Sequence, residues 1–275
     1  MTTGVLDLFR LNGRHALIAG GAGLLGPMFA EALLEAGAQV TILDVNDERL
    51  VRCQEELGRR FAGRLAVQRC DLTDETDVEK AAQAAEATAP VDILVNAAAM
   101  DPKVNGNTAS TPSAGFTEYP AAQWRKALDV NLTGIYLITQ AVCRRMEPRG
   151  RGIVVNISST YGMIGPDQRV YQEGQPEPHF IKPADYTVSK AGLIGFTRYL
   201  AAYYAGRGIR VNCLSPGGVF DNHPEPFAKA YGSRTLLRRM ARRDEYKGAI
   251  VFLCSEASSY MTGTNLEVDV GCTAL

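Results

Sequence analysis

The sequence of 275 residues lacks the features of a membrane, exported or nucleic-acid-binding protein. It has no run of the roughly 18 apolar residues that a membrane-spanning helix needs. Asp7 and Arg10 interrupt the N-terminal segment where a signal peptide has an unbroken apolar core. The formal net charge of −1 gives no electrostatic reason to expect a nucleic acid or an anionic membrane as the main partner. We therefore expect a cytoplasmic protein that acts on a small molecule.

Metal ligands and disulfide patterns are also scarce. The six cysteines form no C-x-x-C pair, and those at positions 70, 143, 213 and 254 lie in apolar stretches. A free thiol packs there as a small hydrophobic group. The three histidines are not spaced as ligands, so we expect no metal site. With 46% hydrophobic and 21% charged residues, the composition is that of a globular protein.

Short apolar segments alternate with amphipathic segments along the whole chain. We expect strands at residues 15–20, 39–44, 65–71, 91–98, 152–159, 209–217 and 264–269. Apolar residues at helical spacing occupy residues 27–38, 47–60, 75–89, 121–146, 184–206 and 244–256. This alternation predicts an α/β fold in one domain over residues 1–275. Its core is a Rossmann-type, doubly wound parallel sheet of about seven strands, covered by helices on both faces.

Three stretches interrupt the regular alternation: residues 100–120, 159–184 and 214–240. They follow the fourth, fifth and sixth expected strands. In an open parallel sheet, ligands bind beyond the carboxyl ends of the strands. We therefore expect these three stretches to be active-site loops.

The first expected strand leads directly into "AGGAGLLG", residues 19–26, which reads as G-x-G-x-x-G through Gly21, Gly23 and Gly26. Such glycines let backbone N–H groups and a helix N-terminus approach a pyrophosphate, although a strand–helix turn without a ligand has the same composition. Asp44 ends the next strand, 18 residues after Gly26. Its carboxylate would accept hydrogen bonds from the ribose hydroxyls and repel a 2′-phosphate, which favours NAD over NADP. Arg49 lies close enough to weaken this preference, and a helix N-cap is the other interpretation of Asp44.

The stretch "YTVSK" places a phenol and an ammonium one helical turn apart, at Tyr186 and Lys190. A free phenol has a pKa near 10, too high for efficient proton transfer at neutral pH. A positive charge at i+4 favours the phenolate. Among the eleven tyrosines, only Tyr186 has a lysine four residues later. A solvated helical turn could carry the same pair, so the pair alone decides nothing.

Over essentially its whole length, the sequence resembles the short-chain dehydrogenase/reductase family, and its length suits the shorter subgroup. Seven signatures occur in the family's order: the glycine turn, "CDLTD", "NAAA", "VNLTG", "NISS", "YTVSK" and "SPGG". The resemblance implies that Tyr186 is the general acid/base and that Lys190 also holds the nicotinamide ribose. Ser159 then orients the reacting oxygen, with Ser158 as the competing serine. Asn131 resembles the family's helix-kink asparagine, which supports a water-mediated proton relay to the lysine.

The same resemblance implies which residues contact the dinucleotide, from the glycine turn through the adenine and ribose contacts to the nicotinamide. These residues are Gly20, Gly23, Leu24, Leu25, Gly26, Asp44, Asp71, Leu72, Asn96, Ala97, Ala98, Tyr186, Lys190, Pro216, Gly217 and Val219. The sequence departs from the family pattern at three positions. Ala19 replaces a threonine, Leu24 stands where most of the shorter subgroup has glycine, and Val270 stands where the family often has glycine.

Ser159 and Tyr186 are 27 residues apart, roughly twice the family's separation. The extra residues should emerge beside the substrate, and their hydrogen-bonding groups suit a polyol or sugar derivative. A segment that packs against a neighbouring subunit is the other interpretation. Arg169 and His223 are candidate substrate contacts. The polar side chains of the extra segment are Asp167, Gln168, Arg169, Gln172, Glu173, His179 and Lys182.

The stretches "SSTYGMIGPDQRVYQ" and "SPGGVFDNHPEPF" resemble a branch of the family associated with bacterial surface-sugar and flagellin-glycan pathways. The leading hypothesis is an NAD(H)-dependent enzyme that interconverts a secondary alcohol and a ketone on a polar, sugar-like substrate. The alternatives are another substrate class, such as a cyclic polyol or a 3-oxoacyl thioester, and a non-catalytic dinucleotide-binding regulator. The resemblance further implies a homo-oligomer, either a tetramer or a dimer.

Overall fold

In the computed structural model, which describes residues 4–102, 114–172 and 180–274, seven parallel strands form one sheet. Their order is β3-β2-β1-β4-β5-β6-β7, so the chain winds outward from β1 in one direction and then from β4 in the other. The strands are β1 (His15–Ala19), β2 (Gln39–Asp44), β3 (Leu65–Arg69), β4 (Val91–Asn96), β5 (Gly152–Ile157), β6 (Ile209–Pro216) and β7 (Asn265–Val268). The predicted Rossmann-type, doubly wound sheet is confirmed.

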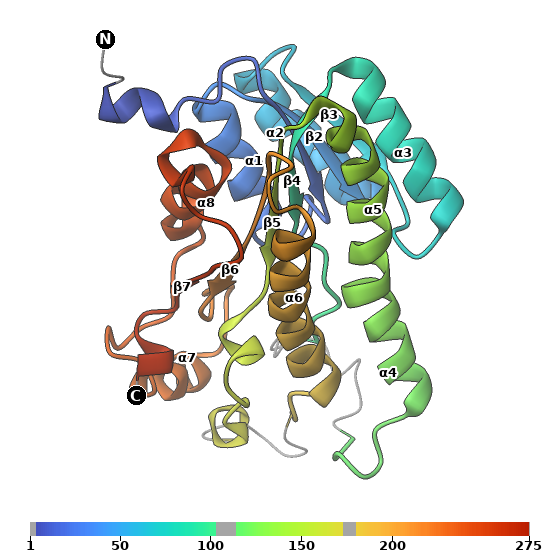
Figure 1. Cartoon of the computed structure of the whole chain (residues 1–275). Coiled ribbons are helices and arrows are strands. Elements are labelled where there is room, and N and C mark those ends of the chain that lie inside the picture. The colour runs from blue at the N-terminus through green and yellow to red at the C-terminus, as the bar shows by residue number, and fades with distance from the viewer. Residues whose placement is uncertain (1–3, 103–113, 173–179, 275) are drawn as a thin grey trace.

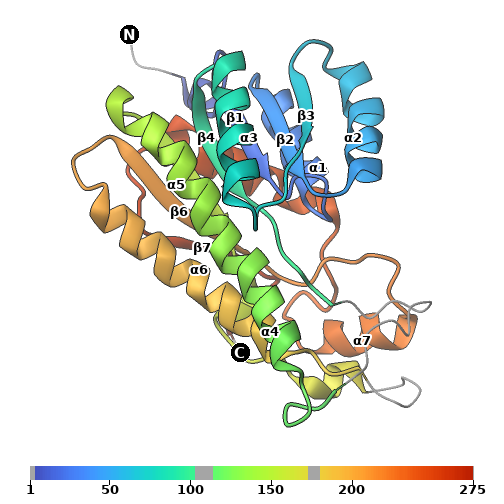
Figure 2. The same cartoon turned by 90° about the vertical axis from the view of Figure 1, so that its right-hand side faces the viewer.

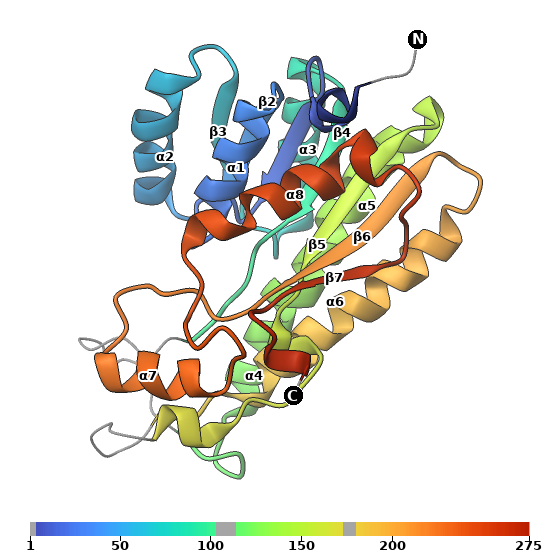
Figure 3. The same cartoon turned by 90° about the vertical axis from the view of Figure 1, so that its left-hand side faces the viewer.

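Helices cover both faces of this sheet. Figure 3 shows α1, α2 and α8 in front of one face, and Figure 2 shows α3, α5 and α6 in front of the other. The α-helices are α1 (Gly26–Glu35), α2 (Asp47–Arg60), α3 (Glu75–Thr88), α4 (Ala121–Leu128), α5 (Ile135–Met146), α6 (Ala184–Tyr203), α7 (Glu225–Ser233) and α8 (Lys247–Cys254). Within the described residues, no helix is both long and apolar enough to cross a membrane.

The core divides into two hydrophobic clusters because successive side chains of a strand point to opposite faces. In β1, Ile18 packs in the cluster that includes side chains of α1, α2 and α8, whereas Leu17 packs with those of α3, α5 and α6. Polar caps fix where helices begin. The side chain of Asn46 accepts a hydrogen bond from the N–H of Arg49 at the start of α2, and Asp74 caps α3 in the same way.

The long helix expected at residues 121–146 is interrupted. A π-helical segment, Asp129–Gly134, separates α4 from α5. π-Helical turns inside α-helices often mark functional sites. The predicted helix at 244–256 is also shorter, because a 3-10 turn precedes α8.

A third hydrophobic cluster lies beyond the carboxyl ends of the strands, and we call it the loop cluster. Figure 1 shows its main element, α7, below the sheet, beside the segment that follows β5. The helix α7 was not predicted and lies within the expected loop at 214–240. The buried members of the loop cluster are Val170, Tyr171, Phe227, Ala230, Tyr231 and Met240.

Candidate active site

A cavity of about 1330 Å³ opens at the carboxyl ends of the central strands. Ligand pockets commonly measure about 300–1,000 Å³, so this cavity has room for a dinucleotide and a second small molecule. Most of the predicted site residues line it: Gly20, Gly23, Leu24, Leu25, Asp44, Asp71, Leu72, Ala97, Ala98, Ser159, Tyr186, Lys190, Pro216, Gly217 and Val219.

The turn after β1 leaves no room for a side chain at its key positions. Gly20 has a φ of 73°, and a β-carbon there would lie 2.3 Å from the Cα of Ala98. At the start of α1, a β-carbon on Gly26 would lie 2.3 Å from the carbonyl oxygen of Gly21. Gly26 therefore closes the turn from behind and is not part of the cavity wall, whereas Gly20 lines the cavity. Bare backbone and the N-terminus of α1 at one wall suit an anionic group such as a pyrophosphate.

Asp44 is held beside this turn by two backbone groups. Its Oδ2 accepts a hydrogen bond of 3.1 Å from the N–H of Ala22, and its Oδ1 accepts one of 3.1 Å from the N–H of Asn46. Because Asn46 is the N-cap of α2, the alternative interpretation of Asp44 as a cap does not hold. The carboxylate is oriented at the cavity wall, where the ribose hydroxyls of a dinucleotide could donate to it. Arg49 lines the same cavity.

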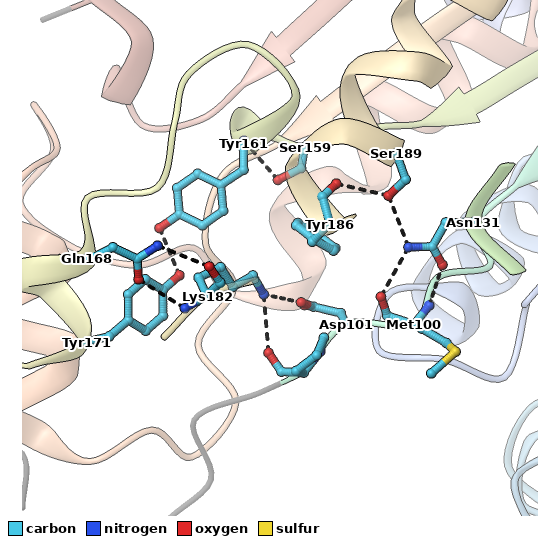
Figure 4. Close-up of polar contacts among 11 residues, drawn as sticks. Met100, Asp101, Asn131, Ser159, Tyr161, Gln168, Tyr171, Lys182, Tyr186 and Ser189 are labelled. Carbon is cyan, nitrogen blue, oxygen red and sulfur yellow. Dashed lines mark hydrogen bonds and ion pairs between the residues drawn. The ribbon is translucent and has the colours of Figure 1, made fainter. Parts of the chain in front are cut away.

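Tyr186 and Lys190 lie on the first two turns of α6, which begins at Ala184. Lys190 is buried, its Nζ donates a hydrogen bond of 2.8 Å to the carbonyl of Ile157 at the end of β5, and it lies 5.6 Å from the ring centroid of Tyr186. Ser159 follows β5 and faces the same cavity, where Figure 4 shows it near Tyr186. The structure thus brings the serine, tyrosine and lysine of the predicted catalytic set to one wall.

The two adjacent serines have different surroundings. The hydroxyl of Ser158 is buried and donates a hydrogen bond of 2.7 Å to the carbonyl of Lys190, which joins the end of β5 to α6. Ser159 is only half-buried, and its Oγ accepts a hydrogen bond of 3.2 Å from the N–H of Tyr161. Its hydroxyl faces the cavity within hydrogen-bonding reach of Tyr186, which favours Ser159 over Ser158 for orienting a reacting oxygen.

Burial dominates the ionisation of both groups on α6. It raises the pKa of Tyr186 well above its ordinary value, the carboxylate of Asp101 adds to the increase, and the hydrogen bond with Ser159 acts in the opposite direction. Burial also lowers the pKa of Lys190 to about 8. The predicted lowering of the Tyr186 pKa by the charge of Lys190 is wrong, because the loss of water around the phenol raises this pKa. At neutral pH Tyr186 is a neutral phenol, the form that donates a proton.

Asn131, in the π-helical segment, lies behind the cavity wall. Its Oδ1 accepts a hydrogen bond of 2.6 Å from the N–H of Met100, while its Nδ2 donates to the carbonyl of Met100 at 3.2 Å and to Ser189 Oγ at 3.1 Å (Figure 4). The side chain thus fixes the chain after β4 against α6. A role in a proton relay stays a prediction.

Asn96 is also buried behind the wall. Its Nδ2 donates hydrogen bonds of 2.8 Å to Thr139 Oγ1 and to Asn156 Oδ1, and Asn156 donates one of 2.8 Å to Thr197 Oγ1. This chain of polar groups links β4, β5, α5 and α6. Asn96 therefore supports the floor of the site, and its predicted cofactor contact stays a prediction.

The segment between Ser159 and Tyr186 contributes less polar surface than expected. Arg169 is 76% exposed at its side chain, binds Asp167 and does not line the cavity, so its prediction as a substrate contact is wrong. Among the predicted polar side chains of this segment within the described residues, Lys182 alone lines the cavity. Residues 173–179, with two further predicted groups, lie outside the described part of the chain.

The loop cluster gives the cavity an aromatic wall with hydroxyl groups on it. The rings of Tyr171 and Phe227 are 5.4 Å apart, and His223 stacks on Phe227 at 4.9 Å. The hydroxyl of Tyr171 lies 3.0 Å from that of Tyr161. His223 lines the cavity, as predicted. This wall was not predicted from the sequence, although Phe227, Ala230 and Tyr231 have helical spacing after a proline.

These features define a class of protein, the Rossmann-type oxidoreductases. The cavity of the doubly wound sheet combines a turn that has room only for backbone, a fixed carboxylate beside that turn, and a Ser–Tyr–Lys set. Within the described residues, no three His, Cys, Asp or Glu side chains gather as metal ligands. The family model described as "Enoyl-(Acyl carrier protein) reductase" matches residues 22–273. The chain belongs to the short-chain dehydrogenase/reductase family and is an enzyme that acts on CH–OH groups.

Relatives of known activity and structure are similar over almost the whole chain. Galactitol 2-dehydrogenase (L-tagatose-forming) of Cereibacter sphaeroides is 35% identical over 273 residues, 97% of each chain. A short chain dehydrogenase of Leptospira borgpetersenii with bound NAD+ has a TM-score of 0.81 at 30% identity, covering 99% of this chain and 97% of that one. A gluconate 5-dehydrogenase of Burkholderia cenocepacia, in complex with NADP and tartrate, has a TM-score of 0.82 at 30% identity, covering 99% and 100%.

Proposed function

We propose that this chain is an NAD(H)-dependent dehydrogenase that interconverts a secondary alcohol and a ketone on a small, polar, sugar-like substrate. The observation that carries the proposal is the position of Ser159, Tyr186 and Lys190 at one wall of the cavity that the glycine turn also lines. The glycine turn, Asp44 and Lys190 would hold the dinucleotide. When bound, its nicotinamide supplies or accepts the hydride.

The residues of the chain handle the proton. In the reducing direction, the neutral phenol of Tyr186 donates its proton to the carbonyl oxygen of the substrate. Ser159 donates a hydrogen bond to the same oxygen and fixes its position as negative charge develops. The ammonium of Lys190, held by the carbonyl of Ile157, stabilises the phenolate that remains. In the oxidising direction, the phenolate of Tyr186 takes the proton of the alcohol.

Asp44 supports NAD over NADP. Two backbone hydrogen bonds hold its carboxylate at the cavity wall, so a 2′-phosphate would meet a fixed negative charge. Arg49 on the same cavity supplies an opposing charge, and solved relatives hold either cofactor. The test is the ratio of kcat/KM for the two cofactors in wild type and Asp44→Asn. We expect wild type to prefer NAD and the variant to lose most of that preference, and a wild type that prefers NADP contradicts the assignment.

The cavity lining around Tyr186 supports a polar substrate. It combines the phenol hydroxyls of Tyr161 and Tyr171 with His223 and Lys182, which suits a compound with several hydroxyl groups better than a long acyl chain. The galactitol and gluconate dehydrogenases among its relatives agree with this choice. The description of the matching family model keeps an acyl thioester as the competing substrate.

A substrate screen with a catalytic control tests the proposal. Polyols, sugar acids and a 3-oxoacyl thioester are offered in both directions while NADH absorbance is followed. We expect turnover with a polyol or sugar acid, and a loss of about 10²–10⁴-fold in kcat for Tyr186→Phe, because the general acid is removed. NAD binding by this variant should survive. Wild-type turnover in Tyr186→Phe would refute the mechanism, and turnover on the thioester alone would refute the substrate class.

We also propose that the chain forms a homo-oligomer, a dimer or a tetramer. Four large side chains on α5 and α6 are well exposed, namely Tyr136, Val188, Tyr199 and Tyr203. Exposed apolar groups that gather on one surface commonly mark an interface. Sedimentation velocity would give the mass in solution, and a monomer at all concentrations contradicts this proposal.

A further inference from the structure

We propose that Lys182 is a positioning residue for Tyr186, and that Lys182 and Asp101 form an opposed pair of charges that sets the balance between the phenol and the phenolate. This inference rests on the proposed function, because it takes Tyr186 as the acid/base. Lys182 is a second cation in the site. It comes from the segment between Ser159 and Tyr186, which is longer in this chain than in most of the family.

Lys182 lies closer to the tyrosine ring than Lys190 does. Its Nζ is 4.2 Å from the ring centroid of Tyr186, against 5.6 Å for the Nζ of Lys190. The Lys182 side chain is only 7% exposed, so water screens its charge weakly. A cation at this distance attracts a neutral ring through its π-electrons and a phenolate through its full charge. Lys182 therefore favours the ionised form of Tyr186.

The backbone and the ammonium of Lys182 are both fixed. The side-chain amide of Gln168 accepts a hydrogen bond from the N–H of Lys182 and donates one to its carbonyl, both at 3.0 Å. The Nζ forms an ion pair with Asp101 and donates a hydrogen bond of 3.3 Å to the carbonyl of Pro102 (Figure 4). The cation thus keeps its place beside Tyr186 without a bound substrate.

The chain next to Asp101 is also fixed by a side-chain amide that hydrogen-bonds the backbone. Asn131 hydrogen-bonds both the N–H and the carbonyl of Met100, the residue that precedes Asp101. Two buried or half-buried carboxamides, Gln168 and Asn131, therefore fix the two chain segments that carry the opposite charges. This arrangement gives the π-helical asparagine a role in orienting the ion pair.

Tyr186 faces few other titratable groups within the described residues. Lys190 approaches from its own helix, Tyr161 from the segment after β5 and Tyr231 from α7. Asp101 raises the pKa of Tyr186 more than either tyrosine does, and only burial has a larger effect. Removing Asp101 and removing Lys182 should therefore shift the ionisation of Tyr186 in opposite directions.

The test compares Lys182→Met with Asp101→Asn in the pH dependence of kcat/KM for alcohol oxidation, with galactitol as the first probe. Oxidation needs the phenolate, so Lys182→Met should move the rising limb to higher pH by about one to three units, the range for a nearby charge. Asp101→Asn should move it to lower pH, and the double variant should return toward wild type. Lys182→Arg keeps the charge and should restore most of the profile. Lys229→Met, an exposed lysine on α7 outside the cavity wall, is the matched control.

Shifts of both single variants in the same direction, or no shift in either, overturn the inference. A change in KM alone for Lys182→Met makes Lys182 a substrate contact and also overturns it. Tyrosinate absorbance of the NAD-loaded protein, taken as the difference from Tyr186→Phe in each background, gives the same comparison without turnover. If Lys182→Met does not fold, Asp101→Asn and Lys182→Gln give the two opposed shifts. Turnover in Tyr186→Phe refutes the proposed function, whereas an inactive Tyr186→Phe with unmoved profiles refutes only this inference.

Discussion

The neighbouring serines at the end of β5 give a direct test of the proposed site, because their hydroxyls have different surroundings. The buried hydroxyl of Ser158 donates a hydrogen bond of 2.7 Å to the carbonyl of Lys190. Ser159 accepts one backbone hydrogen bond and faces the cavity. The substitutions Ser158→Ala and Ser159→Ala each remove one oxygen atom, at adjacent positions. We expect the first to reduce stability and the second to reduce catalysis.

The magnitudes follow from what each oxygen does. Ser158→Ala loses one buried hydrogen bond, about 0.5–1.5 kcal/mol of unfolding free energy, which lowers Tm by about 2–4 °C per kcal/mol in a domain of this size. Its kcat should stay within about threefold of wild type, a barrier change below about 0.7 kcal/mol. Ser159→Ala removes a hydrogen bond to the developing oxyanion, which costs about 10²–10³-fold in kcat. Ser159 also caps the 3-10 turn Thr160–Gly162, so stability should fall by about 0.5 kcal/mol, the low end for losing a Ser cap.

Thermal unfolding of the NAD-free proteins measures the first effect, and steady-state kinetics with the best substrate of the screen measures the second. NAD titration of both variants serves as the control, because neither hydroxyl is assigned to the cofactor. The result that would refute the reasoning is a crossed pattern, with Ser158→Ala inactive and Ser159→Ala active. Equal losses of activity in both variants would also show that burial does not separate the two roles.

Three further predictions concern stability and cofactor binding. Because burial lowers the pKa of Lys190 to about 8, the folded chain binds that proton less tightly than the unfolded chain does. Lys190→Met should therefore stabilise the NAD-free protein relative to wild type below pH 8, and this advantage should fade as pH rises through 8. Urea unfolding at several pH values measures the effect. Val270 has a φ of 56°, so Val270→Gly should relieve about 1–2 kcal/mol of left-handed strain against about 0.5–1 kcal/mol of chain entropy, and a lower Tm would contradict this. At Gly20, an added β-carbon would lie 2.3 Å from the Cα of Ala98, whereas a β-carbon on Gly165 would have no atom within 4 Å. Gly20→Ala should therefore weaken NAD binding far more than Gly165→Ala, as calorimetric titration would measure.

Much of the fold follows from the order of apolar segments. β2 spans the predicted residues, Gln39 to Asp44, and between these polar ends Val40, Ile42 and Leu43 are buried, as expected for a strand covered on both faces. The motif residues reach one cavity because parallel strands end at the same edge of the sheet. The π-helical segment was not predictable from periodicity, since its one extra residue per turn is stabilised by contacts with Met100 and α6, which are distant in sequence.

The surroundings of the segment between Ser159 and Tyr186 were not predictable from the sequence, for a similar reason. Arg169 and Lys182 look equivalent in a polar stretch, yet one is exposed and the other is buried beside Tyr186. Their difference arises from Gln168, which turns its amide toward Lys182, and from Asp101, which comes from the loop after β4. The ionisation of Tyr186 was also predicted wrongly, because the loss of water around its ring depends on neighbours that are distant in sequence.

The loop cluster has a consequence for how such a chain can change in evolution. Val170 and Tyr171 pack with Phe227 and other residues of α7, whereas the two clusters of the sheet have their own members on the strands. A substitution in the loop cluster reshapes the chamber beside Tyr186 while the cradle for the dinucleotide keeps its packing. Under the proposed function, the residues assigned to the chemistry and those beside the substrate pack in separate clusters, so new specificities can arise without rebuilding the core.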